Sequence, residues 1–341
     1  MPDLADKSNP TANPDRPYAN LDPDAILRAI EQLGLVTDGT LLALNSYENR
    51  VYQVGLEEAD PVVVKFYRTG RWSDESILEE HAFTQELADA ELSVVAPMDI
   101  DGQTLFKQTD MRYSVFPRQG GHPPDLENED NLAIVARTMG RLHNVGRQAD
   151  FQHRPQLTCN RMGHDSRKFL LEHSFIPVEL ETAYDTLTQD LLSIIDEKPE
   201  LAASTSGQHI RLHGDCHMGN VLWRDQLPHF VDFDDCVSGP AIQDMWMLLS
   251  GDRQEQSAQL QLILDEYQTF CDFDVSTIGL IEPLRTLRMM HHAAWIARRW
   301  DDPAFPAAFS WFGTERYWSE HLLSLREQFA LLQEAPLGYW P

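Results

Sequence analysis

The N-terminal third of the chain alternates between helical and strand-like patterns of apolar residues. Apolar residues at helical spacing follow Asp22 and Pro23, and Gly34 ends the pattern, as in a capped helix with proline in its first turn. A second helix is predicted from Ser73 to about Ala88. The runs that predict strands are Leu41–Leu44, Arg50–Gly55, Val62–Tyr67, Val94–Val95, Thr104–Lys107 and Arg112–Phe116. We therefore expect a small antiparallel sheet accompanied by helices.

The pattern changes at residues 117–124, where proline and glycine cluster. Beyond this point, apolar residues recur mostly with the helical period of 3.6. The predicted helices are Leu126–Val145, Arg161–His173, Val178–Glu197, Ala241–Leu249, Glu255–Cys271, Ile278–Trp300 and Thr314–Gln333. The fold class is therefore α+β, with a small sheet lobe at 21–117 and a large, mainly helical lobe at 118–341. Residues 1–20 are rich in Pro, Asn and Asp and are predicted to be disordered.

One stretch in the helical part has the pattern of a hairpin. A β-type run at Ile210–Leu212 breaks at Gly214, and two short apolar runs follow at Val221–Trp223 and Phe230–Val231. Such a pattern predicts a loop, a tight hairpin and a second loop at the far end of the hairpin. The two loops are therefore expected to lie side by side at one end of a small β-element.

These two loops carry three oxygen-bearing side chains, Asp215, Asn220 and Asp232. Carboxylate and amide oxygens suit Mg²⁺, a hard ion that usually keeps waters and binds substrate phosphates as well. Phosphoryl transfer needs one carboxylate to receive or orient a hydroxyl proton and further groups to hold the metal. We therefore predict Asp215 and Asp232 as catalytic residues, with Asn220 and Asp232 as the Mg²⁺ ligands.

The motifs HGDCHMGN and VDFDD, the following Gly239-Pro240 and Asp244 resemble the catalytic loop of the aminoglycoside phosphotransferase and choline kinase group, relatives of the eukaryotic-type protein kinases. The segments LNSYENRVYQV, VVKFYR and SGPAIQDMWMLL are similar to the bacterial stress response kinase A family, and this similarity extends over residues 21 to about 340. The resemblance implies a kinase-like bilobal fold with ATP and Mg²⁺ as cofactors.

The resemblance also implies a nucleotide-contacting lysine and its acidic partner. Lys65 ends the run VVVK and corresponds to the kinase strand lysine that contacts the α- and β-phosphates. Its partner should lie on the following helix, where Glu79 and Glu80 compete. Glu80 falls in step with the apolar residues Phe83 and Leu87 on one helix face, so we choose Glu80.

Two further nucleotide contacts are expected in the first lobe. The turn Asn45–Asn49 contains no glycine, which departs from glycine-rich phosphate loops and makes backbone approach harder. By resemblance Ser46 touches ATP, although an ordinary hairpin turn would have the same composition. In the segment between the lobes, Pro117 has no N–H group, so Phe116 and Arg118 are the candidates for backbone contacts with adenine.

Composition narrows the class of protein. The net charge of −27 over 341 residues argues against generic nucleic-acid binding, which requires a basic surface, and suits either a cationic substrate or simple solubility. Four cysteines without metal-ligand spacing fit a reducing compartment. The sequence shows no signal peptide and no apolar run long enough to span a membrane. We expect a cytoplasmic monomer with no nucleic-acid or membrane partner.

The histidines around Asp215 suggest a second kind of site. His213 and His217 lie on either side of this residue, but a zinc site requires three or four protein ligands and the sequence shows no second pair. His213 is therefore expected to pack beneath the loop.

The substrate class follows from the resemblance rather than from the local motifs. Similarity to the stress response kinase A family favours a Ser/Thr protein kinase that acts in stress response and phosphorylates other proteins or itself. The local motifs fit a kinase of small alcohols of the aminoglycoside, choline or homoserine type equally well. A catalytically inactive binding module is disfavoured, because Lys65, Asp215, Asn220 and Asp232 are all present.

Overall fold

The computed structural model describes residues 18, 20–202 and 209–340, so the predicted disorder of residues 1–20 falls almost entirely outside the described residues. The chain forms two compact units. The sheet unit contains the residues up to Asp74, Met98–Arg118 and Trp300–Ala308. The helical unit contains Glu75–Pro97, Gln119–Arg299 and the residues from Phe309 onward. The division into functional lobes after residue 117 stays a prediction.

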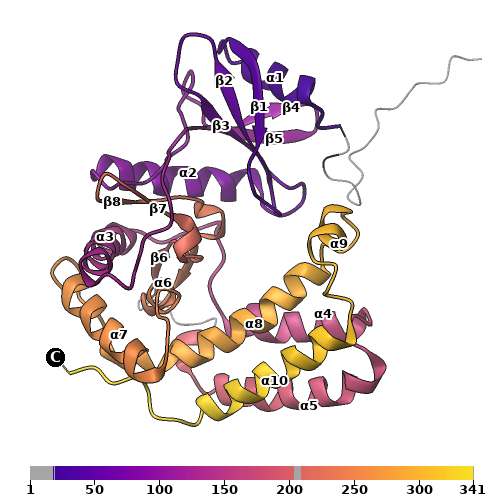
Figure 1. Cartoon of the computed structure of the whole chain (residues 1–341), viewed down its shortest axis with the longest axis vertical. Coiled ribbons are helices and arrows are strands. Elements are labelled where there is room, and N and C mark those ends of the chain that lie inside the picture. Colours follow the sequence, from indigo (N-terminus) through magenta and orange to yellow (C-terminus); the bar gives the residue numbers. More distant parts are fainter. Residues whose placement is uncertain (1–17, 19, 203–208, 341) are drawn as a thin grey trace, which may run out of the picture. The chain divides into compact units, whose positions relative to one another are not determined.

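The sheet unit is built on a five-stranded antiparallel sheet with the order β1-β2-β3-β5-β4 (Figure 1). Its elements are α1 (Pro23–Glu31), β1 (Thr37–Ala43), β2 (Arg50–Leu56), β3 (Val62–Phe66), β4 (Phe106–Gln108), β5 (Met111–Pro117) and α9 (Ala304–Ala308). The predicted cap of the first helix is confirmed, because the Asp22 side chain accepts a hydrogen bond from the Ala25 N–H at 2.7 Å.

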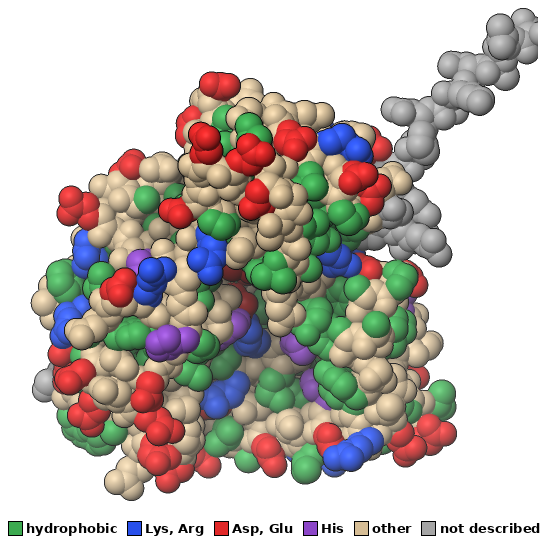
Figure 2. Space-filling view, turned by 45° about the horizontal axis from the view of Figure 1, so that its top comes forward, with side chains coloured by type: hydrophobic (Ala, Val, Ile, Leu, Met, Phe, Trp, Pro, Cys, Tyr) green, Lys and Arg blue, Asp and Glu red, His purple; other side chains and the backbone are tan. Residues whose placement is uncertain are grey.

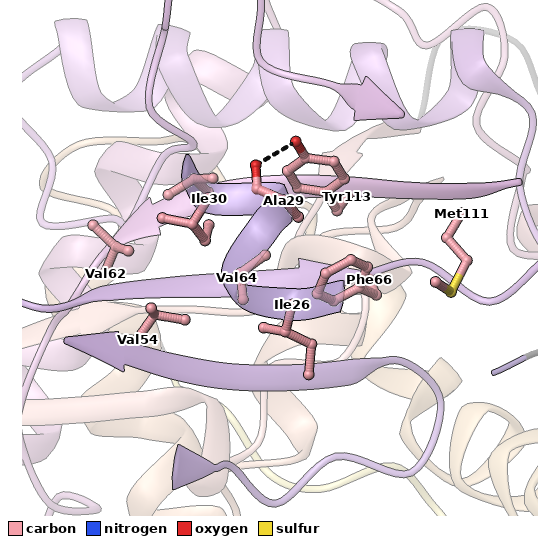
Figure 3. Close-up of a cluster of buried hydrophobic side chains, with 10 residues drawn as sticks. Ile26, Ala29, Ile30, Val54, Val62, Val64, Phe66, Met111 and Tyr113 are labelled. Carbon is pink, nitrogen blue, oxygen red and sulfur yellow. Dashed lines mark hydrogen bonds between the residues drawn. The ribbon is translucent and has the colours of Figure 1, made fainter. Parts of the chain in front are cut away.

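Helix α1 buries its apolar face against the sheet. Ile26 and Ile30 of the helix pack with Val64 and Phe66 of β3 in one buried cluster, which Figure 3 shows. The Tyr113 hydroxyl of β5 donates to the Ala29 carbonyl at 2.8 Å (Figure 3). Burial of each such large apolar side chain contributes about 1.5–3 kcal/mol to the stability of the fold. This packing holds β3, the strand that carries Lys65, in place.

The helical unit contains eight long or short α-helices among the described residues: α2 (Asp74–Asp89), α3 (Glu129–Gly146), α4 (Asp165–Glu172), α5 (Val178–Ile195), α6 (Ile242–Trp246), α7 (Arg253–Tyr267), α8 (Ile281–Ala297) and α10 (Glu315–Leu331). Helices α4, α5, α8 and α10 pack together, and α3 packs against α7 (Figure 1). A single π-turn, Asn160–His164, precedes α4. Short 3₁₀ turns are Pro199–Leu201, Met218–Asn220, Phe233–Asp235 and Val275–Leu280.

Two small β-ladders interrupt the helices of this unit. Strand β6 (Ile210–Leu212) pairs with β9 (Val237–Gly239), and β7 (Val221–Arg224) pairs with β8 (Leu227–Phe230). The β7–β8 hairpin turns through Asp225 and Gln226, which both have positive φ, as the hairpin turn with the matching twist requires. The predicted hairpin is thereby confirmed.

Three sequence-based element predictions need correction, one in its assignment and two in the extent of a helix. Val94–Val95 does not join the main sheet, because Val94 forms an isolated parallel bridge with Phe230 inside the helical unit. The helix expected at Arg161–His173 begins instead with the π-turn and continues as α4. The helix expected at Ala241–Leu249 shortens to Ile242–Trp246.

The described residues include no helix that combines the length and the apolar composition needed to span a bilayer. On the face that Figure 2 shows, acidic side chains are spread over the surface of both units, with basic side chains among them. The negative net charge is therefore dispersed on this face.

Candidate active site

The β6–β9 ladder places the two predicted loops side by side. Leu212 lies opposite Val237 in the register, so the segment after β6 meets the segment before β9. At the junction Gly214 has φ of +85°, and a Cβ atom there would lie 2.1 Å from the Asp235 carbonyl oxygen. Only glycine fits such a position without displacing one of the loops.

Asp244, in the first turn of α6, binds the backbone of the first loop, which follows β6. Its carboxylate accepts hydrogen bonds from the N–H groups of His213 and Gly214 at 2.8 and 2.9 Å. The same carboxylate is 3.1 Å from Nε2 of His143, whose Nδ1 contacts the Tyr267 hydroxyl. These groups are buried, and buried polar atoms need hydrogen-bond partners. The hydrogen bonds of Asp244 therefore determine the conformation of the first loop.

His213 supports the second loop rather than a metal. Its Nε2 atom lies 2.9 Å from the Val231 carbonyl oxygen, and its ring packs on Phe233 with 4.5 Å between centroids. The sequence-based expectation that this residue packs beneath the loop is confirmed.

Asp215 lies between two cationic or potentially cationic side chains. Nη1 of Arg288, on α8, is 2.6 Å from one carboxylate oxygen, and Nε2 of His217 is 3.5 Å from the other. Burial alone would raise the pKa of Asp215, but the His217 hydrogen bond and the charge of Arg288 outweigh it and hold that pKa well below its ordinary value. The carboxylate is therefore ionised throughout the neutral range.

Asn220 connects the two loops. Its side-chain Nδ2 donates to the Asp215 carbonyl at 2.9 Å, and its own carbonyl accepts from the Val231 N–H at 3.0 Å. The second bond joins Asn220 to the residue just before Asp232. With Nδ2 committed to the loop, the amide presents Oδ1 as its acceptor atom.

Asp232 has a strained backbone, with φ of 61° and ψ of 66° in the left-handed region. A non-glycine residue held in such a conformation costs about 1–3 kcal/mol, and such outliers cluster at functional sites. The next turn is fixed by Arg154, which donates to the carbonyl oxygens of Asp234 and Cys236. The turn that follows Asp232 is therefore held in place.

Glu79 and Glu80, the two candidate partners of Lys65, have different surroundings within the helical unit, and the choice of Glu80 as that partner stays a prediction. Glu79 accepts hydrogen bonds from the three successive backbone N–H groups of residues 152–154 at 2.6–2.8 Å. Glu80 is buried, and its Oε2 lies 3.9 Å from Nη1 of Arg154. Glu79 therefore anchors a loop, and Glu80 is the one linked through Arg154 to the turn after Asp232.

Lys65 and Ser46 lie in the sheet unit. Lys65 is buried in β3 between Val51 and Ser114 of the neighbouring strands, and its Nζ is 5.2 Å from the centroid of the Tyr67 ring. Ser46 is half-buried in the turn between β1 and β2. That turn is held by Asn49, whose side chain accepts from the Arg68 N–H at 3.1 Å.

The two predicted adenine-contacting residues lie at the end of β5. Phe116 pairs with Val63 of β3. The Arg118 side chain donates to Gln53 of β2 at 2.8 Å, so this side chain is tied to the sheet.

All four cysteines are buried and reduced. Burial, together with neighbouring carboxylates, raises the pKa of the Cys216 and Cys236 thiols far above neutral pH. A reactive cysteine needs a lowered pKa and access to solvent, so these two thiols act as packing groups beside the loops.

Sequence reasoning missed Arg288 and Arg154. Both act on the loops from helices or segments distant in sequence, and neither lies in a motif that marks it.

Comparison with known proteins identifies the family of the chain. Residues 40–278 match the family model described as the phosphotransferase enzyme family. The chain is 44% identical to stress response kinase A of Escherichia coli O157:H7 over 324 residues, which cover 95% of this chain and 97% of the relative. It is 43% identical to the serine/threonine protein kinase RdoA of Salmonella typhimurium over the same shares. The similarity that the sequence motifs indicated is confirmed.

Solved structures with low sequence identity share the fold. An amicoumacin kinase in complex with AMP-PNP and Ca²⁺ is 19% identical and superposes with a TM-score of 0.74, covering 94% of this chain and 96% of that one. A microcompartment-associated aminopropanol kinase is 15% identical, with a TM-score of 0.67 and coverage of 90% and 96%. The predicted kinase-like α+β fold class is therefore confirmed.

Proposed function

This chain belongs to the phosphotransferase enzyme family, and from that premise we propose that it transfers the γ-phosphoryl group of ATP to a hydroxyl group with the help of Mg²⁺. The observation that carries the proposal is the juxtaposition of Asp215, Asn220 and Asp232 on two loops locked together by backbone hydrogen bonds. Phosphoryl transfer depends mostly on positioning and electrostatic stabilisation, and this rigid pair of loops supplies positioning.

The side chains present fit a Mg²⁺ ion. Asp232 provides a carboxylate and Asn220 a carbonyl oxygen, which are the hard oxygen ligands that this ion prefers. The Nδ2 atom of Asn220 is occupied by the Asp215 carbonyl, which directs Oδ1 to the metal. When bound, Mg²⁺ supplies positive charge to the transferring phosphates.

Asp215 orients the hydroxyl of the substrate. Because Arg288 and His217 keep its pKa low, the carboxylate is a hydrogen-bond acceptor at neutral pH but a weak base. A loose transition state needs little proton abstraction before the phosphoryl group moves, so an oriented hydroxyl suffices. Lys65 contacts the α- and β-phosphates, with Ser46 on the phosphate-covering turn and Glu80 as its acidic partner.

We propose proteins with Ser or Thr as the substrates, including the chain itself, and stress response as the setting. The names of the two relatives support this choice, since both are called kinases of stress response or of serine and threonine. Their similarity covers 95% of this chain, and we propose that the helical unit builds the substrate platform.

A small alcohol is the second candidate substrate. The amicoumacin and aminopropanol kinases share the fold, and both are kinases of small molecules by name. The dispersed acidic surface would suit a cationic molecule of this kind.

The metal ligands can be tested by titrating Mg²⁺ while ATP consumption is measured. Asp232→Asn removes the ligand charge, so we expect kcat to fall by about 100-fold or more with a raised Mg²⁺ requirement, since electrostatic groups at the reacting phosphates contribute that much. Asp225→Asn is the control, because Asp225 is exposed in the turn of the adjacent hairpin and asparagine tolerates positive φ. Equal metal dependence in both variants would refute the assignment.

A further inference from the structure

A second group of potential metal ligands lies outside the phosphotransfer loops. Cys159, His164 and Asp196 each offer one ligand atom, and these atoms all lie within 4.8 Å of one another. Nε2 of His164 is 3.0–3.1 Å from both carboxylate oxygens of Asp196. Among the described residues, these three form the group of His, Cys and acidic side chains whose potential ligand atoms lie this close together.

The π-turn Asn160–His164 is what brings Cys159 and His164 together. The turn closes with a hydrogen bond from the Asp165 N–H to the Asn160 carbonyl. In a regular α-helix, residues five apart point to different faces, because one turn contains 3.6 residues. A turn that closes after five residues aligns them, and π-turns of this kind occur frequently at functional sites.

The third ligand comes from the end of another helix. Asp196 is the C-cap of α5, whose last turn carries no basic residue. A carboxylate at this end faces the negative pole of the helix dipole, which disfavours it by about 0.3–1 kcal/mol. A cation bound to Asp196 would offset that cost.

The space beside the three side chains can hold a further ligand. A cavity of about 210 Å³ is lined by the three residues together with Thr158, Asn160 and Lys198. That volume accommodates water molecules. The ammonium group of Lys198 opposes a cation, but an Asp196 carboxylate and a Cys159 thiolate together carry more charge of the opposite sign.

We propose that Cys159, His164 and Asp196 bind one Zn²⁺ ion, with water from the cavity in the fourth position. A thiolate, an imidazole and a carboxylate are the ligand types that zinc prefers, at about 2.0–2.3 Å in a tetrahedron. The ligand atoms must then lie about 3.5 Å apart, which side-chain rotation reaches from the observed spacing. Binding breaks the S–H bond of Cys159, forms a sulfur–zinc bond and releases the proton to water.

The site is distinct from the proposed Mg²⁺ site in both residues and chemistry. The Mg²⁺ ligands are oxygens, whereas the Zn²⁺ site contains sulfur, which Mg²⁺ avoids and zinc accepts.

The test uses the full-length protein, stripped with a chelator and titrated with Co²⁺ as a spectroscopic probe in excess Mg²⁺. We expect one equivalent of Co²⁺ with a sulfur-to-cobalt charge-transfer band, and displacement of the cobalt by Zn²⁺. Cys159→Ser should abolish the band, and His164→Ala should weaken Zn²⁺ binding by about 100-fold or more, since even outer-shell changes cost 10–100-fold.

Cys271→Ser is the matched control, because Cys271 is also a buried free thiol and lies away from the three ligands. It should retain the band and the affinity. Bound cobalt without a sulfur band in the wild type, or a band that survives Cys159→Ser, would overturn the proposal. If Cys159→Ser does not fold, His164→Ala decides, because His164 is partly exposed; unchanged zinc affinity in that variant would also overturn it.

Discussion

At the scale of single residues, the environment of Asp215 determines what it can do. Nη1 of Arg288 lies 2.6 Å from one carboxylate oxygen, and an opposite charge at this distance favours the ionised form. Asp215 is therefore ionised at neutral pH. Arg288 acts through Asp215 and is a positioning residue.

Replacing Arg288 should become visible in the pH dependence of activity. In Arg288→Met the pKa of Asp215 rises, because burial is then opposed by the histidines alone, without the charge of Arg288. On acidification, we expect kcat/KM for ATP consumption to fall at a pH that is higher than in the wild type by about one unit or more, since a neighbouring opposite charge lowers the pKa of a carboxyl group by about 1–3 units.

The control for this experiment is Arg316→Met, which removes an exposed arginine paired with Glu320 on α10. Its profile should superpose on that of the wild type. Superposable profiles for Arg288→Met and the wild type, with both proteins folded across the range, would show that Arg288 does not set the protonation of Asp215.

Asp244 acts through the backbone of the loop that carries Asp215. Its two oxygens accept from two consecutive backbone N–H groups and also contact His143. An asparagine in its place keeps one acceptor oxygen and adds donors, so one buried N–H group loses its partner. Such a group costs about 1–3 kcal/mol.

Asp244→Asn is therefore expected to lower both stability and activity. Urea unfolding should show a loss of about 1–3 kcal/mol, and kcat should fall by up to about 100-fold, because a displacement of about 1 Å at a catalytic group has that effect. Asp252→Ala removes the cap of α7 and should cost about 1 kcal/mol with kcat unchanged. A similar kcat in the two variants would contradict the role of Asp244.

At the scale of elements, the active-site loops are held by their backbones. The β6–β9 ladder sets their separation, and Gly214 lets them approach. The π-turn before α4 does the same for Cys159 and His164. In both places an unusual backbone conformation, rather than a regular element, places the functional side chains.

Gly214→Ala tests the close approach of the loops. The new Cβ would collide with the Asp235 carbonyl oxygen, so we expect kcat to fall by about 100-fold, again because of displaced catalytic groups. Gly102→Ala is the matched control, since Gly102 has φ of +80° but no atom within 4 Å of its Cβ position. It shares the backbone strain without the collision, and equal activity losses in the two variants would attribute the effect to strain alone.

The sequence predicted the elements that depend on local signals. The cap at Asp22, the β7–β8 hairpin and the long amphipathic helices follow from residue order alone. Val94 was misassigned because its partner, Phe230, lies far along the chain, and the π-turn was missed because its composition is that of an ordinary helix. The choice of Glu80 over Glu79 rests on helix periodicity and stays a prediction, whereas Arg154 and Arg288 required the tertiary structure.

At the scale of the whole molecule, the two units contribute different parts of the proposed reaction. The sheet unit carries Lys65 and the turn with Ser46, and the helical unit carries the loops with Asp215 and Asp232. The length of the similarity to stress response kinase A, 95% of the chain, includes both units. The family relation therefore rests on both units of the chain rather than on one motif.

The central claim is transfer of phosphate from ATP to a protein hydroxyl, and label transfer tests it most directly. Purified chain is incubated with γ-labelled ATP and Mg²⁺, with and without casein, beside Asp215→Ala. We predict label on the chain or on casein, as phosphoserine or phosphothreonine, from the wild type only. ATP consumption without labelled protein would instead support the small-alcohol substrate. The absence of both, with nucleotide binding retained, would contradict the phosphotransferase account itself.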